Sequence, residues 1–279
     1  MFTRILDAIM LRKNLILQGP PGVGKTFIAK RIAWSVIESE NPDYMEMVQF
    51  HQSYAYEDFV QGWRPTESGG FELRNGVFYE FCVKATSEPK KRHVFIIDEI
   101  NRGNLSRIFG ELLMLIEADK RGRKFSIPLT YAKHGERFSV PENVYILGMM
   151  NTADRSLAMV DYALRRRFAF VPLSPAFGSE LFQKHLLDAG VDGALVKLID
   201  ERMLALNKTI QTDTKSLGPG FEIGHSYFIP SSDNQSLNND WFRNIVHTQI
   251  EPLLREYWFD QPETVTRLLE SLLSDHPDR

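Results

Sequence analysis

The sequence predicts an α/β fold in which a parallel five-stranded sheet is sandwiched by helices and followed by a smaller helical domain. Two patterns lead to this prediction. Over the first 172 residues, short apolar runs alternate with amphipathic segments, as is typical of a parallel sheet covered by helices on both faces. Beyond Pro172 the apolar residues recur mainly at helical spacing. We therefore expect an α/β core over 1–172 and a helical domain over 173–279.

The elements of the core follow from short-range patterns. The run Asn14–Gln18 is mostly apolar and is followed by Gly19, as expected of a buried parallel strand. The segment 26–38 has apolar residues near helical spacing and predicts a helix. Further runs bounded by polar residues complete the predicted sheet, at 45–50, 94–97, 144–150 and 168–171.

Two stretches interrupt this alternation. Residues 69–79 contain Asn75-Gly76 between alternating segments, and an Asn-Gly pair is a strong signal of a tight hairpin turn. We expect a hairpin insert near 63–79 with its turn at this pair. Residues 125–138 predict a second hairpin with its turn at 133–136.

The second part of the chain has the apolar pattern of helices rather than of alternating strands and helices. Its segments with apolar faces predict helices at 181–187, 195–210, 241–258 and 263–273. Residues 219–229 read as an irregular glycine-rich insertion, and residues 231–239 read as a polar loop. The segment Pro172–Pro175 marks the boundary between the two parts.

The composition excludes several classes of protein. Of 279 residues, 43% are hydrophobic and 25% are charged, which excludes a disordered or fibrous chain. No run approaches roughly eighteen uncharged apolar residues, so no membrane span is expected. A net charge of −3 excludes binding of nucleic acid by bulk charge alone. The single cysteine, Cys82, fits a reducing, cytoplasmic environment and is expected to pack in the core.

One segment fits the phosphate-binding pattern G-x-x-x-x-G-K-[ST]: Gly19, Pro20, Pro21, Gly22, Val23, Gly24, Lys25 and Thr26. The glycines let the loop turn tightly, so that backbone N–H groups point inward toward an anion at the start of a helix. Lys25 can reach the β- and γ-phosphates of a nucleotide, and the Thr26 hydroxyl can ligate Mg²⁺. The alternative, a structural glycine-proline turn, is much less favoured in this strand-to-helix context.

The run His93–Glu99 supplies a partner for this loop. Its apolar strand delivers Asp98 to the carboxyl edge of the sheet, where ligands bind in open α/β folds. There Asp98 can hold hydrated Mg²⁺, and Glu99 can polarise an attacking water, which favours hydrolysis over binding alone. By itself an apolar strand ending in Asp-Glu usually means a strand exit, but its position after a phosphate loop favours catalysis.

Polar and cationic residues flank the last two predicted strands. The amide of Asn151 can bind a γ-phosphate oxygen or the attacking water, and Asp154 follows closely. An Asx turn leading into a helix is the alternative for this segment. The run Arg165–Arg167 is either a solvated helix end or an arginine finger that enters a neighbouring subunit's site. The spacing alone leaves both interpretations open.

The order of these motifs resembles that of AAA+ P-loop NTPases. The predicted hairpin near Asn75-Gly76 is similar to the insert in the second helix of one AAA+ branch. Longer strings resemble the McrB family, the GTPase subunits of methylation-dependent restriction systems. These strings are Met150–Ser156, Asp161–Phe168, Val48–Tyr54 and Gly224–Phe228, and the resemblance covers nearly the whole chain.

The McrB resemblance implies GTP and Mg²⁺ as ligands, a hexameric ring, DNA bound through the assembled complex, and a partner subunit, McrC, that supplies the nuclease. It places Asn151 and Asp154 at the catalytic centre, and it matches Arg166 and Arg167 to arginines that act in trans. Family members usually carry an N-terminal domain that reads modified DNA. We expect that domain to have been removed here or to lie in another subunit.

Three further sets of residues have two interpretations each. Tyr54 and Tyr56 follow the second strand, where AAA+ rings often place pore loops, but packing in the core or lid is equally expected. His225 either approaches the nucleotide from the lid or is a structural histidine. Residues 120–124 either contact DNA or McrC or, as we prefer, form a solvated charged turn.

The function predicted from these observations is GTP hydrolysis in a ring that drives DNA translocation for a restriction nuclease. One alternative is an ATP-dependent remodelling ATPase of the MoxR type that acts on protein. Another is a nucleotide-locked assembly module that barely turns over. The phosphate loop does not discriminate GTP from ATP, because it contacts phosphates rather than the base.

Overall fold

The structure is a computed structural model that describes residues 2–154, 162–230 and 236–274. The chain forms two compact units. The first comprises Met1–Gln18 and Lys25–Pro172, and the second comprises Gly19–Gly24 and Leu173–Arg279. Of the helices in the described ranges, none is long and apolar enough to cross a membrane.

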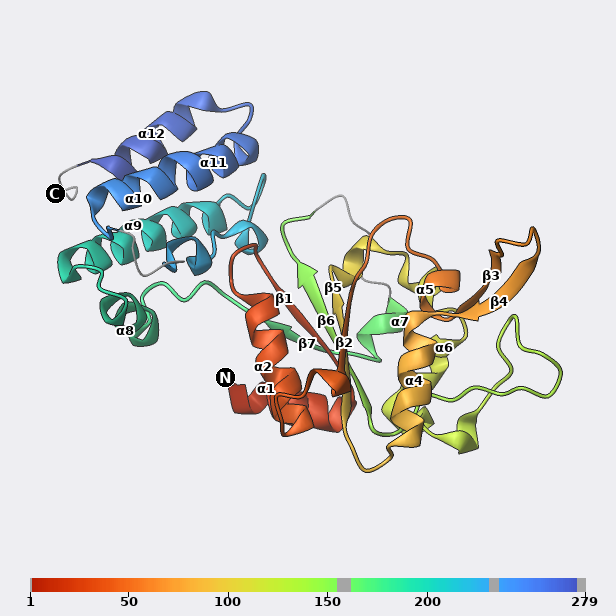
Figure 1. Cartoon of the computed structure of the whole chain (residues 1–279). Coiled ribbons are helices and arrows are strands. Elements are labelled where there is room, and N and C mark those ends of the chain that lie inside the picture. Colours follow the sequence, from red (N-terminus) through yellow and green to blue (C-terminus); the bar gives the residue numbers. More distant parts are fainter. Residues whose placement is uncertain (1, 155–161, 231–235, 275–279) are drawn as a thin grey trace. The chain divides into compact units, whose positions relative to one another are not determined.

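A five-stranded parallel sheet forms the centre of the first unit (Figure 1). The strand order is β2-β5-β6-β1-β7. The strands are β1 (Asn14–Gly19), β2 (Met45–Gln49), β5 (His93–Asp98), β6 (Val144–Asn151) and β7 (Ala169–Pro172). Each strand begins and ends within one residue of a predicted run, and the predicted fold class is confirmed.

Helices cover both faces of this sheet. On one face lie α1 (Phe2–Arg12) and α2 (Lys25–Ile37), and on the other lie α4 (Val77–Ser87), α5 (Leu105–Phe109) and α6 (Leu112–Leu115) (Figure 1). Two further short helices are α3 (Tyr56–Phe59) and α7 (Tyr162–Arg165). The helix α2 matches the predicted one. The sequence analysis missed α1, although Ile5 and Ile9, its two buried residues, stand at helical spacing.

The core of the first unit centres on aromatic side chains between α4 and the sheet. The buried ring of Phe59 has its centroid 4.8–5.7 Å from those of Phe50, Phe78, Phe95 and Phe109. Cys82 is buried in the same core, as expected, and burial raises the pKa of its thiol.

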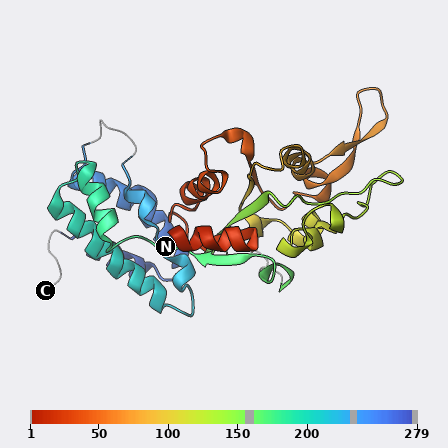
Figure 2. The same cartoon turned by 90° about the horizontal axis from the view of Figure 1, so that it is seen from below.

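A two-stranded sheet projects from the first unit (Figure 2). It consists of β3 (Gln61–Pro65) and β4 (Phe71–Asn75), so a hairpin is present, but its turn lies at residues 66–70. The prediction of a turn at Asn75-Gly76 is wrong, because this pair leads from β4 into α4. Glycine fits at 76 because a Cβ there would lie 2.4 Å from the carbonyl carbon of Phe59.

The second predicted hairpin is reduced to a single bridge. Ile127 and Phe138 exchange backbone hydrogen bonds of 2.9 and 2.8 Å, and a turn is present where Glu136 N–H donates to the Lys133 carbonyl (3.0 Å). Pro128 follows the bridge and has no N–H with which to extend a ladder. The prediction of a hairpin over 125–138 is therefore confirmed for its turn and for one antiparallel bridge, and no strand extends from that bridge within the described ranges.

The second unit is mostly helical. Its helices are α8 (Glu180–Asp188), α9 (Gly193–Thr212), α10 (Asn239–Ile245), α11 (Glu251–Tyr257) and α12 (Pro262–Leu273). The helix predicted over 241–258 is divided by a π-helical turn at Val246–Ile250, where Pro252 in the next turn cannot donate a backbone hydrogen bond. Short 3-10 turns lie in the predicted irregular insertion. Residues 231–235 of the predicted polar loop lie outside the described ranges.

A buried polar network lies at the amino edge of the five-stranded sheet. Asn14, at the start of β1, donates from Nδ2 to the carbonyls of Ile116 (2.7 Å) and Arg167 (3.0 Å). Arg121, 3% exposed, donates to Asn14 Oδ1 (2.7 Å) and to the carbonyls of Ile116 (2.9 Å) and Val144 (3.2 Å). Burial lowers the pKa of Arg121 to about 10. Arg121 is therefore structural, which corrects the prediction of a solvated turn at this one residue, whereas Arg123 and Lys124 are exposed as predicted.

Candidate functional site

The phosphate-loop motif connects β1 to α2, and its residues 19–24 pack within the second unit. The carbonyl of Pro21 accepts a hydrogen bond from Gly224 N–H (3.1 Å), and that of Gly22 accepts one from Ser226 N–H (2.9 Å). In a trans peptide the N–H points away from the C=O. The N–H groups of Gly22 and Val23 therefore point away from the segment 224–226, as the cradle for an anion requires.

Glycine is required on both sides of this contact. Gly22 has a φ of +77°, and a Cβ on it would lie 2.9 Å from Tyr227 Cε2. A Cβ on Gly224 would lie 2.0 Å from the carbonyl carbon of Gly22. The lid segment that the sequence analysis read as part of an irregular insertion therefore packs directly on the phosphate loop.

Lys25 and Thr26 begin α2, and Lys25 lies within electrostatic reach of three carboxylates. Burial lowers the pKa of Lys25, and the charges of Glu99, Asp98 and Asp154 oppose this effect. Asp98 is the last residue of β5, so these groups meet at the carboxyl edge of the sheet. The structure thus brings together candidates that lie far apart in the sequence.

Glu99 follows β5 in a left-handed backbone conformation, with φ 50° and ψ 44°, which is uncommon for a residue other than glycine. Its N–H donates to Asp98 Oδ1 (3.0 Å). Burial raises the pKa of Glu99, the charge of Arg102 opposes this, and Asp98 and Asp154 raise the pKa further. A carboxylate with a raised pKa is a stronger proton acceptor than an exposed one once it is ionised.

Arg102 is a site residue that the sequence analysis missed. Its Nε lies 3.3 Å from Glu99 Oε2, and its Nη2 lies 3.1 Å from Asp154 Oδ2. One guanidinium therefore bridges two carboxylates that follow neighbouring strands. The i,i+3 spacing of Glu99 and Arg102 across a short 3-10 turn was the signal present in the sequence.

Asn151 ends β6, beside β5. Its Oδ1 accepts a hydrogen bond from Ala153 N–H (3.2 Å), so the Asx turn considered as an alternative is present. Its side-chain NH₂ group has no hydrogen-bond partner among the residues that the structure describes, which leaves a donor for a phosphate oxygen or a water. The Asx turn and a contact with nucleotide are therefore compatible.

Asn101 adds an acceptor to this region. It is 8% exposed and donates to the Asn151 carbonyl (3.4 Å). Its Oδ1 is buried and has no hydrogen-bond partner within the described chain. Buried acceptors are normally satisfied, so this oxygen fits a site that receives a donor from water or ligand.

The arginine pair lies at the opposite edge of the sheet. Arg166 and Arg167 precede the amino end of β7, whereas Asp98 and Asn151 lie at carboxyl ends. Because the sheet is parallel, the two edges are separated by a strand length, roughly 15–20 Å. Both arginines pair with Glu117 Oε1, at 3.1 and 2.9 Å. The structure does not bring this pair to the chain's own Lys25.

Other candidates take part in packing within their own units. His225 Nδ1 accepts a hydrogen bond from Ala176 N–H (3.1 Å), its ring contacts that of Phe182, and burial lowers its pKa. Tyr56 is 8% exposed and donates to Glu111 (2.7 Å), and the ring of Tyr54 packs on that of Phe50. These contacts favour the packing interpretation for all three side chains.

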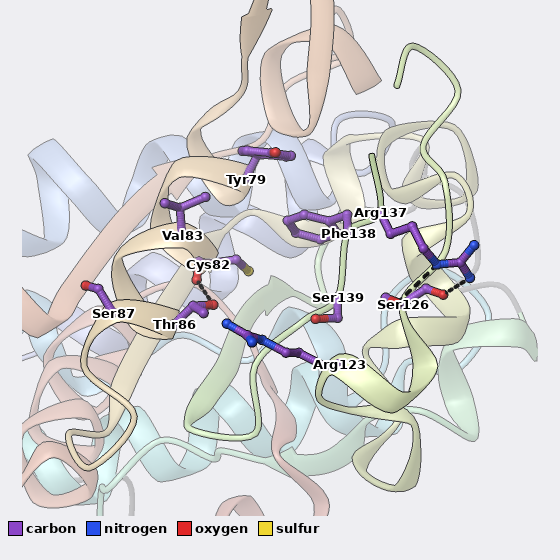
Figure 3. A pocket seen from close by; sticks show the side chains of 10 residues that line it. All are labelled: Tyr79, Cys82, Val83, Thr86, Ser87, Arg123, Ser126, Arg137, Phe138 and Ser139. Carbon is purple, nitrogen blue, oxygen red and sulfur yellow. Dashed lines mark hydrogen bonds between the residues drawn. The ribbon is translucent and has the colours of Figure 1, made fainter. Parts of the chain in front are cut away.

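A hollow of about 540 Å³ lies beside α4, with Arg123, Arg137, Tyr79 and Phe138 around it (Figure 3). It contains none of the predicted nucleotide-site residues. Arg137 is held by Ser126, and Arg123 points into the hollow. Arg123 therefore has a different environment from the buried Arg121, although both belong to the same predicted turn.

The donor set fits Mg²⁺ that is bound together with a nucleotide. In the described ranges, no group of three or more His, Cys, Asp or Glu side chains is arranged to hold a metal by itself. Mg²⁺ is usually held by one or two protein ligands plus substrate phosphates and water. Thr26 and Asp98 can supply this smaller set.

Comparisons with known proteins agree with the fold and the lid. Residues 14–168 match the family described as AAA domain (dynein-related subfamily), and residues 198–266 match McrB, alpha-helical lid domain. The chain is 51% identical over 273 residues to the type IV methyl-directed restriction enzyme EcoKMcrB subunit of Escherichia coli strain K12. These aligned residues make up 97% of this chain and 59% of that protein.

A second similar protein is more distant. The type II restriction enzyme BsuMI component YdiS of Bacillus subtilis strain 168 is 27% identical over 194 residues, which covers 57% of this chain and 56% of that protein. The chain thus spans less than two thirds of the length of either relative.

The bridging position of Arg102 predicts a shift in the titration of Glu99. The Arg102→Gln variant removes the charge that holds the pKa of Glu99 down, so this pKa should rise further above its ordinary value. Under the role expected of Glu99 from the sequence, that of proton acceptor for the attacking water, the acid limb of the rate of nucleotide hydrolysis should then move to higher pH, because a carboxyl group must be ionised to accept a proton. Carboxyl ¹³C NMR titration and a pH–rate profile measure both effects.

Arg107→Gln is the matched control, because it removes an exposed positive charge nearby on α5. An unchanged pKa of Glu99 in the Arg102→Gln variant, or an equal shift in both variants, would contradict the role given to Arg102.

Proposed function

The chain belongs to the dynein-related subfamily of AAA domains and carries an McrB-type helical lid, and from this premise we propose that it hydrolyses GTP as a ring-forming motor. The motor would drive DNA translocation for a restriction nuclease that another subunit supplies. The observation that carries the proposal is the group formed by Asp98, Glu99 and Asp154 with Lys25 of the phosphate-loop motif, in a chain 51% identical to a restriction-enzyme subunit.

The chemistry proposed for this site uses each group in one role. The N–H groups of the phosphate loop and Lys25 bind the phosphates, and Thr26 and Asp98 hold Mg²⁺, which neutralises phosphate charge when bound. Glu99 accepts a proton from the attacking water, whose oxygen bonds to the γ-phosphorus as the bond to the β-phosphate oxygen breaks. The NH₂ group of Asn151 orients the water or a γ-phosphate oxygen, and Asp154 keeps Arg102 in place.

The arginine pair supports assembly as a ring. Arg166 and Arg167 lie at the amino edge of the sheet, while the chain's own phosphate loop follows a strand at the carboxyl edge. We therefore assign them to the nucleotide of a neighbouring subunit, where a guanidinium would stabilise charge that grows in the transition state. One chain alone then holds an incomplete catalytic site.

The choice of GTP and the partners rest on similarity. The relatives are described as a restriction enzyme subunit and a restriction enzyme component, which supports a partner nuclease subunit and DNA as the substrate of the complex. The match to a dynein-related AAA domain keeps ATP-driven remodelling of protein as a second candidate. The two candidates differ in the nucleotide that they prefer.

Nucleotide competition separates these two candidates. We expect GTP to displace a fluorescent guanine nucleotide from the Glu99→Gln variant at least about tenfold more effectively than ATP, a difference of about 1.4 kcal/mol. This variant keeps the size of the side chain and loses its basicity, so it should bind nucleotide without turnover. Equal affinities or a preference for ATP would favour the remodelling ATPase. Absence of turnover in the wild type with its partner and DNA would favour an assembly module.

Mixing two inactive variants tests whether the arginines act in trans. Arg166→Ala keeps an intact phosphate loop, and Lys25→Ala keeps intact arginines. Each alone should hydrolyse GTP poorly, since a trans arginine contributes about 10³–10⁵ in rate. Mixed rings should recover activity at interfaces where the intact halves meet.

The control replaces Lys25→Ala by the Lys25→Ala/Arg166→Ala double variant, which has no intact half to contribute and should restore nothing. If mixed rings form, as shown by native mass spectrometry, and no activity returns, Arg166 does not act across the boundary.

A further inference from the structure

The carboxylate of Glu117 forms ion pairs with both Arg166 and Arg167. Glu117, which follows α6, has its Oε1 3.1 Å from Arg166 Nη2 and 2.9 Å from Arg167 Nη2. Two guanidinium groups in contact with the same oxygen repel each other, and the shared negative charge offsets that repulsion. Removal of the charge would let the more exposed arginine move away from its neighbour.

The backbone on both sides of this contact is fixed by the buried network around Asn14. Asn14 Nδ2 binds the carbonyl of Ile116, the residue before Glu117, and also the carbonyl of Arg167. Arg121 donates to Asn14 Oδ1 and to the same Ile116 carbonyl. The separation between the backbones of Glu117 and Arg167 is therefore set by the fold and does not depend on the ion pair alone.

The three side chains differ in how much they face solvent. Exposure is 9% for Arg167, 23% for Glu117 and 69% for Arg166. Together with Leu11, Arg12 and Asp119 they line a hollow of about 380 Å³. Three arginines and two carboxylates thus surround a space that an anionic group of another molecule can enter.

We propose that Glu117 is a positioning residue that keeps Arg166 beside Arg167 and directed at the γ-phosphate held by a neighbouring subunit. This inference rests on the proposed function, because it requires the pair to act across a subunit boundary. Arg167, the buried member, stays paired with Glu117, and Arg166, the exposed member, contacts the phosphate. Glu117 itself touches no nucleotide and transfers no proton.

Substitution of Glu117 tests the proposal in the assembled ring with GTP. Glu117→Gln keeps the shape and removes the charge, and kcat should fall about tenfold while KM stays within about twofold, because the phosphate loop that binds GTP is unchanged. Glu117→Asp, which keeps the charge, should retain most of kcat and covers the case in which Glu117→Gln folds poorly. Glu80→Gln makes the same chemical change on the exposed side of α4 and should behave as wild type.

A double-mutant cycle with Arg166→Ala distinguishes positioning from general stabilisation. If Glu117 acts through Arg166, then Glu117→Gln should cause no further loss of kcat in single-turnover experiments on the Arg166→Ala variant. An equal loss in both backgrounds, or a wild-type kcat in Glu117→Gln beside an inactive Arg166→Ala, would overturn this inference alone. A fully active Arg166→Ala would overturn the trans role in the proposed function, and the inference with it.

Discussion

The direct packing of Gly224 on Gly22 is the contact on which the conformation of the phosphate loop depends. It leaves no space for a Cβ at either position, and the hydrogen bonds beside it hold two carbonyls of the phosphate loop toward the lid segment. The N–H groups of the same peptides are thereby directed the other way. Lys25 follows this loop immediately in the chain and begins α2, where the charges of Glu99, Asp98 and Asp154 act on it.

The parallel sheet separates two kinds of charge. Asp98, Glu99 and Asp154 lie at or just beyond carboxyl ends of strands, while Arg166 and Arg167 precede an amino end. There Asn14, itself bound by Arg121, holds the carbonyl of Arg167. Under the proposed function this separation has a simple consequence. Each chain offers acids for its own nucleotide and arginines for a neighbour's, so hydrolysis depends on assembly, and Glu117 keeps the arginines in a usable arrangement before contact.

Most of the sheet could be predicted from the sequence, because a strand whose two faces are both covered by helices is apolar along its whole length, as Val94–Ile97 is. The sequence analysis placed the hairpin turn wrongly, because glycine is needed at position 76 for close packing against the backbone of Phe59. That packing is a tertiary contact, which the local sequence does not reveal. Arg121 was misread for a related reason, since a charged residue in a basic run looks solvated until its buried carbonyl partners are known. Arg102 contacts Glu99, three residues earlier, and Asp154, which follows β6. Spacing along the chain indicates the first contact, whereas the second depends on where β6 ends in the fold.

The most direct test of this account is nucleotide binding by the Gly224→Ala variant, measured by isothermal titration calorimetry. Gly193→Ala is the matched control, because a Cβ at Gly193 meets only Leu187 Cδ2 at 3.8 Å. The account predicts that Gly224→Ala loses at least about tenfold in affinity, or about 1.4 kcal/mol, with its circular dichroism spectrum unchanged, while Gly193→Ala binds as wild type. Wild-type affinity in Gly224→Ala would contradict it, since the phosphate loop would then keep its shape without the contact.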